Sequence, residues 1–169
     1  MKFMLLAWSL LLAGCGYSTV YQTTADAVQS VAVAEVVVNT GEKLPGERRV
    51  AQLVNRRLAQ VFTSHPDSAA YTLHIHLDEE QRTLAVLRDA TEDRFEVVLT
   101  ASLSLKDHKG EQVFQKVYTT TAIYNVEPSP LSTDAGRERA RQSAAEFTSR
   151  EAIQYINFFL HEQKRNGDA

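Results

Sequence analysis

Apolar side chains alternate with mostly polar ones between Phe95 and Leu105. Because neighbouring side chains of a strand point to opposite faces, this period of two predicts a strand with one buried face and one polar face. The apolar face needs another layer of structure to cover it, and the polar face must meet water or a polar partner. The fold must therefore be layered, with one side of a sheet left open.

Three further segments have strand character. Residues Tyr71–Asp78 alternate in the same way, and the strand is expected to continue irregularly to Val86. Ser30–Val38 is rich in β-branched and small residues, and Gln112 to about Tyr124 is rich in Val, Thr, Tyr and Phe. The composition of Asp107–Gly110 predicts a hairpin turn between the last two strands.

Two segments have helical spacing of their apolar residues. The first runs from about Glu47 to Phe62, and Pro66 marks its end. The second runs to about Gln163 and could be capped by any of three residues, Ser132, Thr133 or Asp134. Its predicted apolar side is formed by Ala140, Ala144, Phe147, Ile156, Phe159 and Leu160.

The order β-α-β-β-β-α predicts an α+β fold. We expect a two-layer sandwich in which two helices cover one face of a four-stranded mixed or antiparallel sheet. The length of 169 residues is typical of one domain, with residues 30–163 forming the folded part. Residues 164–169 are expected to form a flexible tail.

The N-terminus has the pattern of a secretory signal. Lys2 precedes an apolar run to Leu12 that is too short to span a bilayer, and Cys15 follows two small residues. Leu12–Cys15 resembles a bacterial lipobox, which predicts a signal peptide over residues 1–14, cleavage before Cys15 and acylation of this cysteine by groups such as palmitate. Several acyl chains make a durable membrane anchor. Residues 15–29 would then form a lipidated tether, and Gly16, where an inner-membrane retention signal has Asp, favours the periplasmic side of the outer membrane.

Few residues suggest catalysis or cofactor binding. His74 and His76 would share one face of a strand with Asp78. A histidine pair can chelate zinc, but a zinc site needs a third and usually a fourth ligand, and the sequence offers no obvious one beyond Asp78 or a distant histidine. Ser64, His65 and Asp67 have the residue types of a catalytic triad without a nucleophile-elbow motif. With neither a P-loop nor a dinucleotide fingerprint, the sequence predicts no enzyme, metal or cofactor.

Charge gives a weaker indication of binding. The net charge of −3 provides no basic field for nucleic acid, so no nucleic-acid partner is expected. Local clusters of basic residues can nevertheless pair with phosphate or carboxylate groups. They are Arg48, Arg49, Arg56 and Arg57 on the first helix, Arg88 and Arg94 beside one turn, and Lys106, Lys109 and Lys116 around the hairpin.

The mature chain as a whole resembles the lipopolysaccharide-assembly lipoproteins of the LptE family, especially their alphaproteobacterial branch. The resemblance rests on the order of soft motifs along nearly all of the chain. These motifs are the lipobox with Cys15-Gly16-Tyr17, then Tyr71-Thr72-Leu73-His74-Ile75, Ala122-Ile123-Tyr124-Asn125-Val126, Ser129-Pro130 and Asp134-Ala135-Gly136-Arg137-Glu138-Arg139-Ala140.

The resemblance implies a role and partners. A member of this family would plug the lumen of the outer-membrane barrel LptD, assist assembly of that barrel and bind lipopolysaccharide during its delivery to the outer leaflet. Lipid attachment maps onto Cys15. No motif fixes which residues bind lipopolysaccharide, and we nominate Arg88, Arg94, Lys106 and Lys109 as a hypothesis.

Two other interpretations remain open from the residues. Ser30–Phe62 also resembles the opening of a TolB-type lipoprotein domain, which would make the protein a regulator of a cell-wall or secretion partner. Alternatively, His74 and His76 could belong to a small-ligand carrier or a zinc enzyme.

Overall fold

A computed structural model describes residues 30–40, 47–62, 65, 67–84 and 94–167 of the chain. The predictions made for Cys15, the signal peptide, the tether and Arg88 lie outside these residues. The described elements confirm the predicted order and the α+β class. They are β1 (Val31–Thr40), α3 (Glu47–Ala59), β2 (Tyr71–Thr83), β3 (Arg94–Asp107), β4 (Gln112–Asn125) and α4 (Pro130–Gly167).

The four strands form one mixed sheet in the order β1-β2-β3-β4. β1 is parallel to β2, and α3 provides the crossover that a parallel connection requires. β2, β3 and β4 form an antiparallel meander. The tight turn between β3 and β4 places Gly110 at a φ of 82°, which is a left-handed conformation that glycine adopts without a steric penalty.

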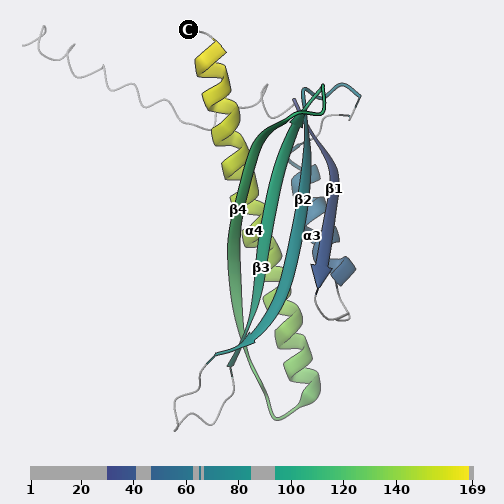
Figure 1. The fold of residues 1–169 in the computed structure, drawn as a ribbon. Coiled ribbons are helices and arrows are strands. Elements are labelled where there is room, and N and C mark those ends of the chain that lie inside the picture. Colours follow the sequence, from purple (N-terminus) through teal and green to yellow (C-terminus); the bar gives the residue numbers. More distant parts are fainter. Residues whose placement is uncertain (1–29, 41–46, 63–64, 66, 85–93, 168–169) are drawn as a thin grey trace, which may run out of the picture.

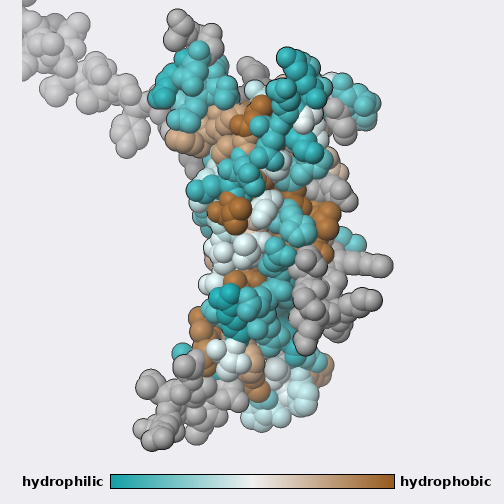
Figure 2. All heavy atoms as spheres, in the orientation of Figure 1, coloured by the Kyte–Doolittle hydropathy of each residue, from teal (hydrophilic) through white to brown (hydrophobic). Residues whose placement is uncertain are grey.

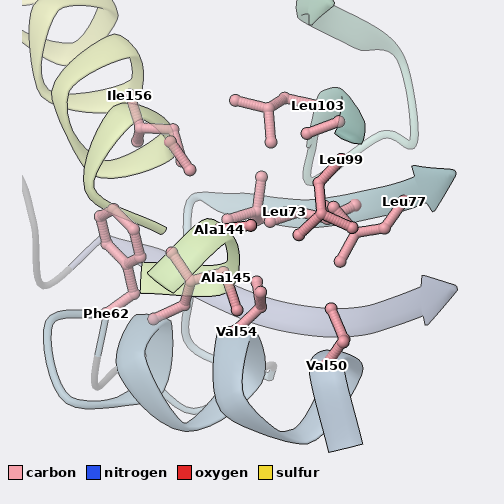
Figure 3. Packing of buried hydrophobic residues seen from close by; sticks show 14 of the residues in the cluster. Val50, Val54, Phe62, Leu73, Leu77, Leu99, Leu103, Ala144, Ala145 and Ile156 are labelled. Carbon is pink, nitrogen blue, oxygen red and sulfur yellow. The ribbon is translucent and has the colours of Figure 1, made fainter. Parts of the chain in front are cut away.

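Both helices lie behind the same face of the sheet, α4 behind β4 and β3 and α3 towards β1 (Figure 1). Figure 3 shows Val50, Val54 and Phe62 pointing from the α3 segment towards Leu73, Leu77, Leu99 and Leu103 of the strands. These side chains are at most 3% exposed, and all belong to one hydrophobic cluster. The period-two and helical patterns of the sequence therefore converge on a single core.

Where α4 crosses the sheet, most of its buried residues are small. Ala140, Ala144, Ala145 and Ala152 are buried, and so is Thr148 between them. The Tyr118 hydroxyl on β4 donates to the carbonyl of Thr148 at 2.5 Å, and the hydroxyls of Thr120 and Thr148 are 2.6 Å apart. The contact between α4 and β4 is therefore close and partly polar.

Phe147 is not part of the apolar side of α4, as the sequence predicted, because it is 46% exposed. One residue along a helix turns the side chain by about 100°. The sheet-facing position belongs to the neighbouring Thr148, whose hydroxyl is satisfied by Thr120. A polar residue thus occupies the place at which the sequence suggested an aromatic one.

The ends of both helices also differ from the predicted ends. α3 ends at Ala59, although the amide of Phe62 still donates to the carbonyl of Leu58 at 2.7 Å and prolongs the turn. α4 begins at Pro130, which needs no amide partner in a first turn, so the three proposed caps lie inside the helix. It continues to Gly167, past the predicted end at Gln163.

One buried ion pair joins the sheet to α4. The guanidinium Nε of Arg141 donates to Oε1 of Glu79 at 2.6 Å, and the two side chains are 6% and 2% exposed. The second carboxylate oxygen of Glu79 has no hydrogen-bond partner among the described residues. Removing one member of such a pair leaves a charge in the protein interior without its counter-charge.

We predict that Glu79→Gln lowers the free energy of unfolding by about 3–5 kcal/mol, because it removes the carboxylate that faces the buried charge of Arg141 at 2.6 Å. Glu80→Gln is the matched control, since Glu80 forms a pair of similar length, 2.7 Å, with Arg82 on the exposed face. An exposed pair contributes little to stability, because water screens both charges. Urea titration of the three proteins gives the comparison, and equal losses for both variants would contradict the assignment.

We predict that the fold loses stability at alkaline pH because of the Tyr118 phenol. Burial, and secondarily the charge of Glu151, raises the pKa of the Tyr118 phenol. The unfolded phenol titrates near pH 10, so the stabilisation is complete below about pH 10 and is lost as the pH rises above it, by up to about 1.4 kcal/mol per pH unit. Tyr118→Phe should show a shallower loss of unfolding free energy over this range. Parallel pH profiles for the two proteins would refute the prediction.

Candidate functional site

The sheet face opposite the helices is open and mostly polar. In the register of the sheet, this face carries alternate residues of each strand, such as His74, Thr100 and Thr119. The hydroxyls of Thr100 and Thr119 are 3.2 Å apart, and Ser104 donates to Gln112 at 3.1 Å. Figure 2 shows this face as predominantly hydrophilic, with separate hydrophobic spots. The polar character of this open face confirms what the alternation of the strands predicted.

The hydrophobic exceptions lie on the two outer strands. Val37 on β1 is 41% exposed, while Val117 and Ile123 on β4 are 54% and 60% exposed. A groove of about 240 Å³ crosses the face from Val37 on β1 to Gln115 on β4. It is lined by Val37, His74, Ile75, His76, Ser102, Leu103, Ser104 and Gln115. The face can therefore offer hydroxyl, imidazole and amide groups to a polar ligand or surface.

The histidines of β2 lie on this face as the alternation predicted. Nε2 of His76 is 3.5 Å from Oδ1 of Asp78, and both side chains are about half exposed. His65 and Asp67 form another exposed contact at 3.3 Å, whereas Ser64 lies outside the described residues. Within the part of the chain that the structure describes, no group of three or more His, Cys, Asp or Glu side chains could hold a metal ion.

The structure separates the basic residues that the sequence nominated together. Arg94 begins β3 and Lys106 lies near its other end, twelve residues away along an extended strand, which corresponds to roughly 40 Å. Lys109 lies in the hairpin turn beyond Lys106. A single phosphate group cannot contact both ends, so these residues belong to two distinct ends of the molecule.

The hairpin end is organised by Asp107. Its Oδ1 accepts the backbone amides of Lys109 and Glu111, each at 2.9 Å. Desolvation opposes ionisation of this carboxyl group, but the two amide donors and the nearby charges of His108 and Lys109 together lower the pKa of Asp107. On the open face, the hydrogen bond from Arg82 lowers the pKa of Glu80 in a similar way. Both carboxylates are thus held in the charged state.

The opposite end contains a polar pocket that sequence reasoning missed. It has a volume of about 510 Å³ and lies between the end of β4 and the first turns of α4. Its polar lining comprises Asn125, Glu127, Ser132, Arg139 and Ser143. Arg94 lies opposite Asn125 in the strand register. Only the contact between α4 and β4 brings these residues together, so nothing in their local spacing indicates a pocket.

The basic residues of α3 are partly used within the fold. Arg49 pairs with Glu138 of α4 at 3.1 Å, and Arg57 donates to Gln60 at 3.2 Å. Arg56 and Arg57 border a groove of about 340 Å³ between the helices, together with Glu146. The carboxylate reduces the positive charge there, so this groove is a weaker anion site than the cluster of arginines suggested.

Comparison with known proteins finds a matching family model for this chain. The sequence model of the family described as LptE, lipopolysaccharide-assembly, matches residues 28–158. No curated protein matches the sequence as a relative.

None of the helices in the described residues is long and apolar enough to cross a membrane.

Two solved structures are similar in fold. One is a Caulobacter crescentus protein assigned as a lipoprotein, which has a TM-score of 0.59 and 18% identity, with 83% of this chain and 96% of that chain covered. The other is lipoprotein B from Nitrosomonas europaea, with a TM-score of 0.50, 14% identity and coverage of 78% and 87%. At these identities, the likeness establishes the shared architecture.

Proposed function

Because the chain belongs to the LptE family of lipopolysaccharide-assembly proteins, we propose that it is an outer-membrane lipoprotein that plugs the LptD barrel. In this role it assists assembly of the barrel and delivery of lipopolysaccharide to the outer leaflet. The match over residues 28–158 carries the proposal, because it includes all four strands, α3 and most of α4.

The open sheet face supports a position inside a barrel. The lumen of an outer-membrane barrel is polar, and a plug must present polar groups to it. The hydroxyl and amide groups of Thr100, Thr119, Ser104 and Gln112 already bond to one another across the face. They can exchange partners with lumen side chains at little cost, because each remains accessible to water.

Membrane attachment in this proposal depends on Cys15. Cleavage of residues 1–14 would free the amine of this cysteine, and acylation would hold the protein at the periplasmic side of the outer membrane. The role requires no catalysis and no cofactor, since a plug acts by binding.

For lipopolysaccharide, we favour the end of the molecule that carries Arg94. The polar pocket beside it contains Arg139 as well as Glu127, so two guanidinium groups and one carboxylate lie at the same end. Guanidinium groups bind phosphate in a bidentate manner, which ammonium groups cannot do. Arg88 lies outside the described residues and stays a sequence-based hypothesis, whereas Lys106 and Lys109 form the alternative at the hairpin.

We predict that the double variant Arg94→Glu and Arg139→Glu binds lipopolysaccharide about five- to tenfold more weakly, because two phosphate-binding charges are reversed. The measurement is titration of the full chain in detergent with purified lipopolysaccharide. Lys106→Glu with Lys109→Glu is the matched control with the same change of charge, and it should bind within about twofold of the unchanged protein. A larger loss in the control would place the contact at the hairpin end instead.

A further inference from the structure

β4 is an edge strand with an open outer edge. It pairs with β3 on one side, and no described strand lies on its other side. It is 14 residues long, and its sequence contains no proline and a single charge, Lys116. Natural edge strands are usually short, charged or interrupted by proline, which prevents pairing with other chains. β4 has little of this protection.

A groove runs beside this edge, between β4 and α4. It has a volume of about 310 Å³ and is lined by Tyr118, Thr119, Thr120, Thr121, Phe147, Glu151 and Tyr155. The rings of Tyr118 and Tyr155 are 5.3 Å apart, and Lys116 Nζ lies 5.0 Å from the Tyr155 ring centre. Phe147 is 46% exposed, so the groove has an apolar rim on the helix side of the edge.

We propose that the outer edge of β4 accepts an extended segment of a partner polypeptide as a fifth strand. Its apolar side chains would lie on the rim formed by Phe147 and Tyr155, and its polar side chains would continue the open face. This repeats the arrangement of β3, whose Leu99 and Leu103 face the helices while Thr100 and Ser104 face outward. The proposal goes beyond barrel plugging, because the wall of a closed barrel has no free strand edge to offer.

The chemistry of the edge selects a polypeptide as the occupant. A row of backbone amide and carbonyl groups is complemented by another backbone, which supplies donors and acceptors at the same repeat. An acyl chain could fill the apolar rim but could not satisfy these groups. Because Lys116 is the one charged residue of β4, a segment that is nearly uncharged along the edge fits without repulsion.

The test uses a synthetic peptide with the sequence of residues 95–105, made soluble by a glycol tail, and the full chain in detergent. This segment already pairs with the inner edge of β4, so its side-chain pattern suits the strand. We expect the peptide to bind the chain saturably and the backbone amides of β4 to exchange hydrogen more slowly than in the chain without peptide. A peptide with the same side chains, N-methylated at several residues of both parities, lacks the amide hydrogens at those positions and should bind at least about tenfold more weakly.

A pair of protein variants locates the binding site. Phe147→Asp should weaken peptide binding at least about fivefold, while Phe158→Asp is the matched control, because Phe158 is a 65% exposed aromatic residue of α4 outside the groove.

Equal binding of the methylated peptide would overturn the proposal in favour of side-chain adsorption. A dimer of the chain itself that Phe147→Asp disrupts would assign the edge to a second copy and overturn it too. Loss of lipopolysaccharide binding is a separate readout, which tests the proposed function and not this inference.

Discussion

The long helix α4 can lie close to the sheet because most of the residues between them are small. Ala140, Ala144, Ala145 and Ala152 leave room for the Tyr118 and Thr120 hydroxyls to reach the helix backbone and Thr148. A helix of 38 residues extends about 57 Å, enough to span strands of 14 residues from end to end. This contact buries the inner face of β3 and β4, and the Glu79–Arg141 ion pair joins α4 to β2.

Burial of one face determines what the other face can do. With both helices behind the sheet, no described element covers the open face or the outer edge of β4. The two ends are separated by the length of β3, so an anionic ligand at Arg94 and a contact at Lys106 are independent events. In the proposed function, this separation would allow the protein to contact a barrel with its open face while one end binds a lipid phosphate.

Local pattern predicted the elements of the fold, because strand alternation and helical spacing are set by neighbouring residues. It failed where a tertiary contact decided the outcome. Thr148 replaced Phe147 on the sheet side of α4 because a hydroxyl of β4 pairs with it, and Arg139 joined Asn125 through packing of distant segments. The sequence groups Arg94, Lys106 and Lys109 only by their positive charge. The length of β3 places Arg94 and Lys106 near opposite ends, so they cannot bind the same phosphate group.

The central claim is that this chain forms a complex with an outer-membrane barrel, while the TolB-type alternative predicts a cell-wall or secretion partner. Purification of the tagged full chain from a detergent extract of its own cells tests the claim most directly. We expect a large outer-membrane β-barrel protein to co-purify in an equal molar amount. Recovery of a cell-wall synthase or a secretion component, without such a barrel, would contradict it.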